Sequence, residues 1–135
     1  MARIMAGDIP GNVNVVAFKV ASRAATATDV SGFFRAPAAI KVTNLTVTFN
    51  SAVTGANTNN FKVYLINRGT SGAGTTSVGE VTFASGVNAG AKVPYTITVT
   101  NPDVAAGELL EAGFAVNGSG LASDVATIQF DYRFA

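Results

Sequence analysis

The stretch from residue 39 to residue 49 constrains the fold of this chain more than any other part. It carries five large apolar residues, two at even positions and then three at odd positions: Ile40, Val42, Leu45, Val47 and Phe49. Side chains of a β-strand alternate strictly between its two faces, so one unbroken register cannot bury all five. The sequence therefore predicts an extra residue near Thr43 and Asn44, either as a β-bulge or where the strand passes from one sheet to the other.

The rest of the chain repeats this pattern of short apolar segments separated by turns rich in Gly, Asn and Ser. The pattern predicts about eight strands, and no stretch has a helical period. Such strands are typical of a β-sandwich or a closed barrel. We expect an all-β, single-domain, two-sheet antiparallel sandwich of the jelly-roll kind at residues 13–135, after an N-terminal arm at residues 1–12. The expected strands are 13–20, 31–35, 39–49, 61–67, 76–84, 93–100, 108–117 and 125–134.

Three of these strands carry more detailed expectations. Residues 13–20 are apolar on both faces, which predicts a strand that is sandwiched on both sides or covered by a partner. The aromatic residues of the last strand predict a central position in its sheet. In the segment 93–100, Pro94 indicates an edge position, because proline lacks an amide hydrogen. The alternation there predicts four inward-facing side chains: Val93, Tyr95, Ile97 and Val99.

The composition limits the possible partners. Charged residues make up 13% of the chain, against roughly 25% in an average soluble domain. The net charge is +1 and no basic run is present, which argues against nucleic-acid binding. No apolar segment approaches the ~20 residues of a membrane-spanning helix, and residues 1–10 lack the apolar core of a secretory signal. A surface with so few charges is expected to be partly covered by other subunits.

The residue types also exclude most catalytic arrangements. The chain contains no histidine and no cysteine, so it cannot form a Ser-His-Asp or Cys-His arrangement or an ordinary zinc site. Glu108 and Glu111 lie three apart on an expected strand and therefore point to opposite faces, which prevents them from acting as a local carboxylate pair. The glycine-rich segments 72–74 and 118–120 lack the lysine and the following helix of a phosphate-binding loop. We expect no enzymatic activity, no cofactor and no metal.

Adjacent aromatic residues indicate a possible contact surface. Phe33 and Phe34 lie next to each other on an expected strand, so one ring must point away from the domain's own core. That ring either packs beneath a loop or between the sheets, or it joins a subunit contact beside Arg35, because interfaces are enriched in aromatic residues and arginine. Tyr64 and Ile66 face outward on the strand 61–67 and admit the same interpretation.

The N-terminal arm is a second candidate for contacts between subunits. Residues 1–12 mix apolar and turn residues without a clear period. The arm is either a frayed terminus or a segment that docks on a neighbouring subunit through Arg3, Ile4 and Met5.

The segment from Gly32 to Val42 combines a strand, an Arg-Ala-Pro corner at Pro37 and the start of the long strand. With the strand that follows Gly107 and the aromatic last strand, it resembles the small head-decoration (cement) and other virion structural proteins of tailed bacteriophages. The resemblance implies a jelly roll that forms trimers on the capsid surface. It also implies that the protein cements the lattice of the major capsid protein, often through an N-terminal arm, and that it has no catalytic residues.

A second class of function stays open, a carbohydrate- or receptor-binding module of the tail-fibre or adhesin kind. Such a module needs exposed aromatic rings in a groove, and Tyr64 and Tyr95 are the candidates in a chain without tryptophan. A stable trimer would favour the virion subunit, whereas a glycan-binding monomer would favour the binding module. A hydrolase that uses paired acids is a third class, and only acids distant in sequence could form its site.

Overall fold

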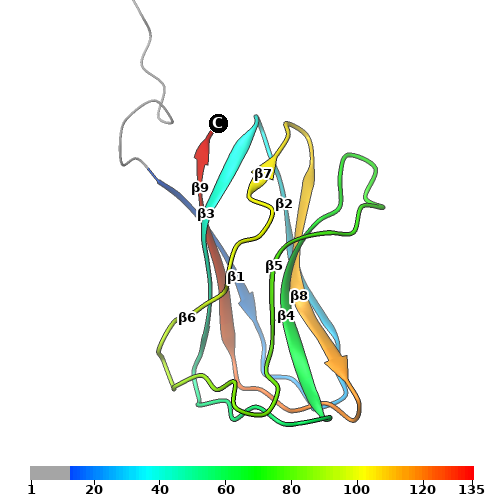
Figure 1. Cartoon of the computed structure of the whole chain (residues 1–135), viewed down its shortest axis with the longest axis vertical. Coiled ribbons are helices and arrows are strands. Elements are labelled where there is room, and N and C mark those ends of the chain that lie inside the picture. Colours follow the sequence, from blue (N-terminus) through cyan, green and yellow to red (C-terminus); the bar gives the residue numbers. More distant parts are fainter. Residues whose placement is uncertain (1–12) are drawn as a thin grey trace, which may run out of the picture.

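The computed structural model describes residues 13–135, which form nine β-strands and no helix within that range. The described residues therefore contain no helix that could span a membrane. Figure 1 shows two sheets side by side, with most strands running along the long axis of the molecule. The strands are β1 (Asn14–Val20), β2 (Asp29–Arg35), β3 (Ile40–Phe49), β4 (Asn60–Asn67), β5 (Thr76–Thr82), β6 (Tyr95–Thr96), β7 (Asp103–Val104), β8 (Leu109–Asn117) and β9 (Ala126–Phe134).

The order of the strands confirms the predicted jelly roll. The first sheet has the order β1-β9-β3-β6, with β7 also paired to β3, and the second sheet has the order β2-β8-β4-β5. All pairs are antiparallel and they nest in sequence: β1 pairs with β9, β2 with β8, β3 with β6 and β7, and β4 with β5. This nesting is the two-sheet jelly-roll arrangement. The last strand, β9, lies between β1 and β3, so its predicted central position is also confirmed.

Strand β3 has its irregularity where the sequence predicts it. Its pairing with β9 shifts between Val42, opposite Tyr132, and Asn44, opposite Asp131, so that Thr43 is the extra residue. The strand remains in the first sheet throughout, and the β-bulge is therefore the correct alternative. The bulge turns all five apolar residues of β3 inward, where none is more than 2% exposed.

The core between the sheets contains two groups of packed aromatic rings among its aliphatic side chains. One cluster of four rings, with centroids 5.2 to 6.1 Å apart, is formed by Phe49, Phe61, Phe83 and Phe114. A second group, with centroids 5.3 to 6.1 Å apart, is formed by Phe18, Phe34, Phe130, Tyr132 and Phe134. Most of these contacts are tilted or edge-to-face, and each such pair contributes about 0.5–1.5 kcal/mol beyond its buried area.

A buried arginine closes one end of this core. Arg23 is 8% exposed, and its guanidinium lies 4.7 Å from the ring centroid of Phe61 and 4.9 Å from that of Phe114. Its Nη1 donates hydrogen bonds to the carbonyl oxygen of Leu121 at 3.1 Å and to Ser123 Oγ at 3.4 Å. Desolvation by burial lowers the pKa of the Arg23 side chain, and the negative charge of Asp29 opposes part of this effect. The attraction of the two rings for a cation offsets part of this desolvation cost.

The predicted strand at residues 93–100 is mostly absent. Within this segment only the two residues of β6 form regular pairs, with β3, and Val93 is 57% exposed instead of facing inward. The preceding residue, Lys92, has a φ of 59°, and the Val93 side chain lies over Gly90 in the same loop. The tight turn therefore includes Val93 and extends to Pro94. Only Tyr95 and Thr96, the two residues of β6, then form regular strand pairs.

The remainder of that segment passes from one sheet to the other. The amide of Ile97 donates to the carbonyl oxygen of Leu45 in the first sheet, and the amide of Thr100 donates to that of Val78 in the second. A segment that bridges two sheets cannot continue the pairing of either, although its apolar side chains still alternate. The predicted inward orientation of Tyr95, Ile97 and Val99 is accordingly confirmed.

The bulge in β3 leads to a testable prediction. Deletion of Thr43 would turn Ile40 and Val42 to the outer face, and burial of such side chains is worth about 1.5–3 kcal/mol each. We expect the deletion to lower the free energy of unfolding, measured with urea, by about 3–6 kcal/mol, a large part of a total stability of about 5–15 kcal/mol. The substitution Thr43→Ala keeps the extra residue and should change the free energy of unfolding by less than about 0.5 kcal/mol. Equal stability of the deletion variant and the wild type would contradict the role of the bulge.

Candidate subunit interface on the second sheet

The two adjacent aromatic residues of β2 point to opposite sides, as the sequence predicts. Phe34 packs inside the sandwich, with ring centroids 5.5 Å from Phe130 and 5.3 Å from Tyr132. Phe33 lies on the outer face of the second sheet and is 57% exposed. Phe33 is therefore the ring of the pair that a partner could contact, and no loop of the described residues covers it.

A bulge in β2 brings a second apolar side chain to this outer face. The pairing of β2 with β8 shifts between Val30, opposite Gly113, and Gly32, opposite Ala112. Without the shift, Val30 and Phe33 would face opposite sides, because they are an odd number of residues apart. With it, both side chains lie on the outer face, and Val30 is 50% exposed.

Strand order places further predicted residues beside Phe33. Across β2, β8 and β4, the register aligns Phe33 with Glu111 and Glu111 with Ile66. The next outer row aligns Val30 with Gly113 and Gly113 with Tyr64. The structure therefore brings together three of the predicted candidates, Phe33, Tyr64 and Ile66, from strands that are distant in sequence.

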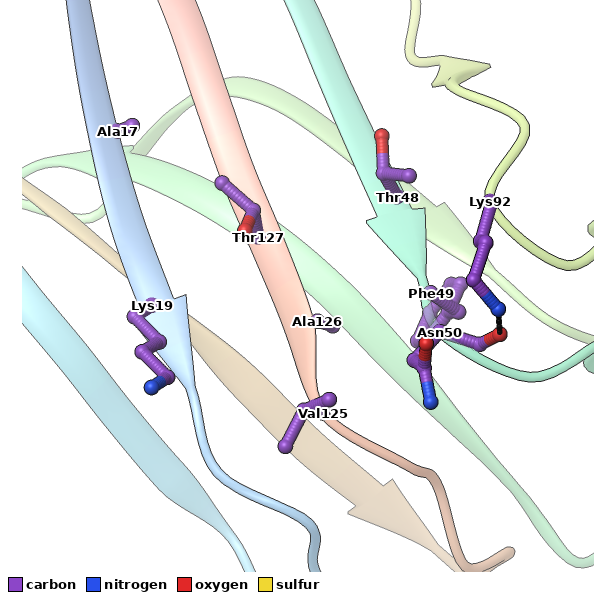
Figure 2. A pocket seen from close by; sticks show the side chains of 9 residues that line it. All are labelled: Ala17, Lys19, Thr48, Phe49, Asn50, Lys92, Val125, Ala126 and Thr127. Carbon is purple, nitrogen blue, oxygen red and sulfur yellow. Dashed lines mark hydrogen bonds between the residues drawn. The ribbon is translucent and has the colours of Figure 1, made fainter.

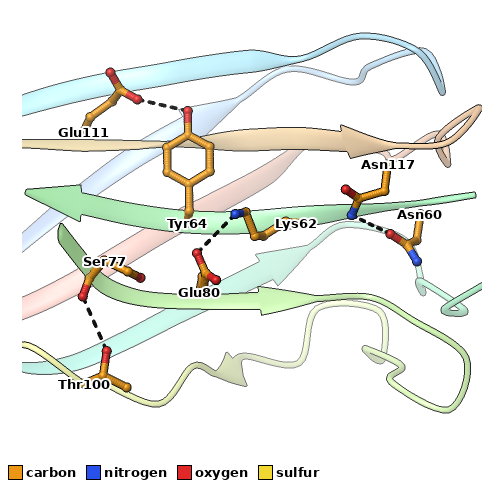
Figure 3. A network of polar contacts seen from close by, with 8 residues as sticks. All are labelled: Asn60, Lys62, Tyr64, Ser77, Glu80, Thr100, Glu111 and Asn117. Atoms are coloured by element: carbon orange, nitrogen blue, oxygen red, sulfur yellow. Dashed lines mark hydrogen bonds and ion pairs between the residues drawn. The ribbon is translucent and has the colours of Figure 1, made fainter. Parts of the chain in front are cut away.

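A polar cluster, formed by Tyr64, Arg68 and Glu111, lies on this face. Figure 3 shows the Tyr64 hydroxyl directed at the Glu111 carboxylate. The Tyr64 hydroxyl donates to Glu111 Oε2 at 3.1 Å, and Arg68 Nη2 donates to the same oxygen at 2.8 Å. The hydrogen bond from Arg68 lowers the pKa of Glu111. Burial and the hydrogen bond to the Glu111 carboxylate raise the pKa of Tyr64 to about 12. The cluster is internally paired, so a partner could cover it without leaving a charge unsatisfied.

Gly113 makes room for the cluster. A Cβ atom at this position would lie 2.6 Å from the Tyr64 hydroxyl and 2.4 Å from the carbonyl oxygen of Asp29. The sequence did not predict that four further residues belong to this surface: Val30, Arg68, Glu111 and Gly113. A glycine inside a strand does indicate close approach of another group, and that signal could have identified Gly113.

Arg35 lies on the same outer face as Phe33, two residues further along β2 and opposite Leu109. It is exposed, and its Nη1 donates to the carbonyl oxygen of Gly107 at 2.6 Å, so it is held by a loop of its own chain. Arg3, Ile4 and Met5 of the N-terminal arm lie outside the described residues.

Neither tyrosine proposed as a sugar platform presents its ring to solvent. Tyr64 is 8% exposed, and Tyr95 packs against Phe83 with ring centroids 5.3 Å apart. The described residues also contain no group of three or more acidic side chains that could hold a metal ion. Glu108 accepts a hydrogen bond from Asn67 and Glu111 is bound by Arg68 and Tyr64, so both carboxylates are engaged by neighbouring side chains.

The raised pKa of Tyr64 predicts a loss of stability at alkaline pH. Folding favours the neutral phenol, so this contribution is complete below pH 10 and is lost as the pH rises to about 12. We expect Tyr64→Phe to be less stable than the wild type at pH 8 by about 1–2 kcal/mol, with a difference that shrinks between pH 10 and 12. Urea unfolding at each pH measures this.

Tyr95→Phe is the matched control, because no carboxylate within residues 13–135 bonds the Tyr95 hydroxyl. A constant difference between wild type and Tyr64→Phe across the whole pH range would contradict the proposed titration.

No protein-family model, no curated protein and no solved structure matches this chain.

Proposed function

We propose that this protein is a structural subunit of a virus particle, a decoration or cement protein of a phage head. It self-associates, with a trimer as the expected state, and it binds the lattice of the major capsid protein. Its action is mechanical: each contact that forms only in the assembled shell stabilises the shell relative to its separated parts.

The outer face of the second sheet is the observation that carries this proposal. Val30 and Phe33 are exposed there, and the half-buried side chains of Ile66 and Leu109 lie beside them. These apolar side chains surround the paired polar cluster, and an apolar, partly aromatic surface with few free charges is typical of the buried part of subunit interfaces. The face also contains an arginine and a tyrosine whose polar groups are already satisfied, and these residue types are enriched among interface hot spots.

Composition and fold support the same proposal. The 13% share of charged residues is low for a chain that must remain soluble alone. The jelly roll is a recurrent fold of viral capsid proteins, although it also occurs in lectins, so this support is by analogy. The resemblance of the segment from Gly32 to Val42 to phage head-decoration proteins selects the virion among these possibilities.

The alternative is a carbohydrate- or receptor-binding module, which is favoured by a hollow on the outer face of the first sheet whose lining includes Lys19, Thr48, Lys92 and Thr127. The two functions involve opposite faces of the sandwich, so one chain can perform both.

The oligomeric state of the full chain tests the proposed interface. We expect light scattering coupled to size exclusion to give a trimer for the wild type, and a smaller species for Phe33→Ser at the same concentration. Val93→Ser is the matched control, because Val93 is also 57% exposed but lies near the edge of the first sheet. A wild type that stays monomeric at high concentration would contradict self-association, and equal effects of both substitutions would contradict the assigned face.

A second experiment tests the virion assignment directly. Mass spectrometry of virus particles purified from the source of the gene should detect this chain in a fixed ratio to the major capsid protein. Its absence from intact, purified particles would overturn the assignment.

A further inference from the structure

A hollow lies on the outer face of the first sheet, at the end where β1 and β3 finish and β9 begins (Figure 2). Its volume of about 390 Å³ falls within the range of small-molecule sites, about 300–1,000 Å³. Small side chains from β1, β3 and β9 form its floor, and Lys19 and Lys92 lie on opposite sides of it. Its lining includes Ala17, Lys19, Thr48, Lys92, Val125 and Thr127.

The hollow is positively charged. Lys19 comes from β1 and Lys92 from the loop before β6, and no carboxylate is among the residues that line it. Lys92 Nζ donates to the carbonyl oxygen of Asn50 at 3.2 Å. The Lys19 ammonium has no hydrogen-bond or ion-pair partner in the part of the chain that the structure describes. Figure 2 shows the two lysines on opposite sides of the floor.

The nearest acid, Asp124, is already fully engaged. Its carboxylate accepts hydrogen bonds from Ser22 Oγ at 3.1 Å, Asn50 Nδ2 at 2.8 Å, Ser51 Oγ at 2.6 Å and the amide of Val125 at 2.7 Å. These donors lower the pKa of Asp124, so it remains ionised and holds three loops together. With two ammonium groups against one carboxylate, an excess of positive charge remains at the hollow.

The backbone of Lys92 is a separate sign that its side chain has a role. Lys92 is the only residue other than glycine with a positive φ among residues 13–135, at 59°. A side chain in this conformation costs free energy that glycine would avoid, and the same loop uses Gly86 with a φ of 87°. Backbone strain of this kind is found preferentially at functional sites. The chain thus has a lysine beside the hollow at a position where a glycine would avoid the strain.

Two hydroxyl groups complete the arrangement. Lys19, Thr127 and Thr48 form one row across β1, β9 and β3, with each residue directly opposite the next. Both threonine side chains line the hollow, and neither makes a side-chain hydrogen bond to another described residue. Ala17 and Val125 add methyl groups to the lining. The hollow thus combines two ammonium groups, two available hydroxyls and an apolar surface.

We propose that this hollow binds an acidic saccharide through a carboxylate on a sugar ring. The carboxylate lies between the ammonium groups of Lys19 and Lys92, because hydrogen bonds between ionised partners are the strongest available there. The sugar hydroxyls bond to Thr48 and Thr127, and the C–H face of the ring packs against Ala17 and Val125. The site is on the opposite sheet from the proposed interface, so either inference can fail without the other.

Titration of the full chain with glucuronate, followed by NMR of assigned methyl groups, tests this site. We expect saturable shifts of the methyl signals of Ala17, Thr48, Val125 and Thr127, with smaller changes elsewhere. Glucose lacks the carboxylate and acetate lacks the ring, so each should bind at least about tenfold more weakly. Equal affinity for acetate would overturn the saccharide, equal affinity for glucose would overturn the role of the lysines, and no saturable shift with glucuronate would overturn the site.

Three lysine variants separate a specific site from general attraction. Lys19→Ala and Lys92→Gly should each weaken glucuronate binding about tenfold. Lys92→Gly should also unfold at an equal or higher urea concentration than the wild type, because glycine relieves the positive φ. Lys41→Ala removes the same charge near the other end of β3 and should leave binding unchanged. Equal weakening by Lys41→Ala would show that only net charge matters and would overturn the proposal.

Discussion

The extra residue at Thr43 is the constraint on which the rest of this sandwich depends. Strand β3 pairs with β9 along most of its length and with β6 and β7 on its other side, so its faces set the orientation of the whole first sheet. The bulge allows both halves of β3 to bury their apolar residues. As a result, Leu45 is buried in the core and Phe49 packs in one of the aromatic clusters. The same alignment turns Thr46 and Thr48 outward. The polar outer face of the first sheet, and with it the floor of the hollow, is a consequence of burial on the inner face.

The sequence predicts the strands well because apolar periodicity reports directly which side chains are buried. It predicts the segment 93–100 poorly, since alternation fixes the direction of side chains but not their hydrogen-bond partners. Ile97 faces inward in either case, whether its backbone pairs along one strand or bridges two sheets. For Val93 the predicted side-chain direction itself is wrong. Val93 continues the alternation of apolar residues in the sequence, but it lies in a tight turn before the strand and is exposed.

The contact surfaces are less predictable because they are assembled from residues distant in sequence. The adjacent pair at Phe33 reveals one outward ring, but nothing near it in sequence reveals that Glu111 and Ile66 lie in the same row. A buried cation is equally hidden. Arg23 follows β1 in a short loop, and only the fold shows that its guanidinium packs against Phe61. Such positions depend on strand order and register, which local patterns do not contain.

The few charges of this chain do less to keep it soluble than their number implies. Many are held by neighbours: Lys62 pairs with Glu80 at 3.2 Å (Figure 3), and Arg68 pairs with Glu111. Asp124 binds three loops together and Arg23 is buried in the aromatic core. Charges with a fixed partner are partly neutralised and interact less with water than isolated ones do. The domain thus uses several of its charges internally and exposes Phe33 and Val30 on the outer face of the second sheet, which is the arrangement that the proposed subunit contact requires.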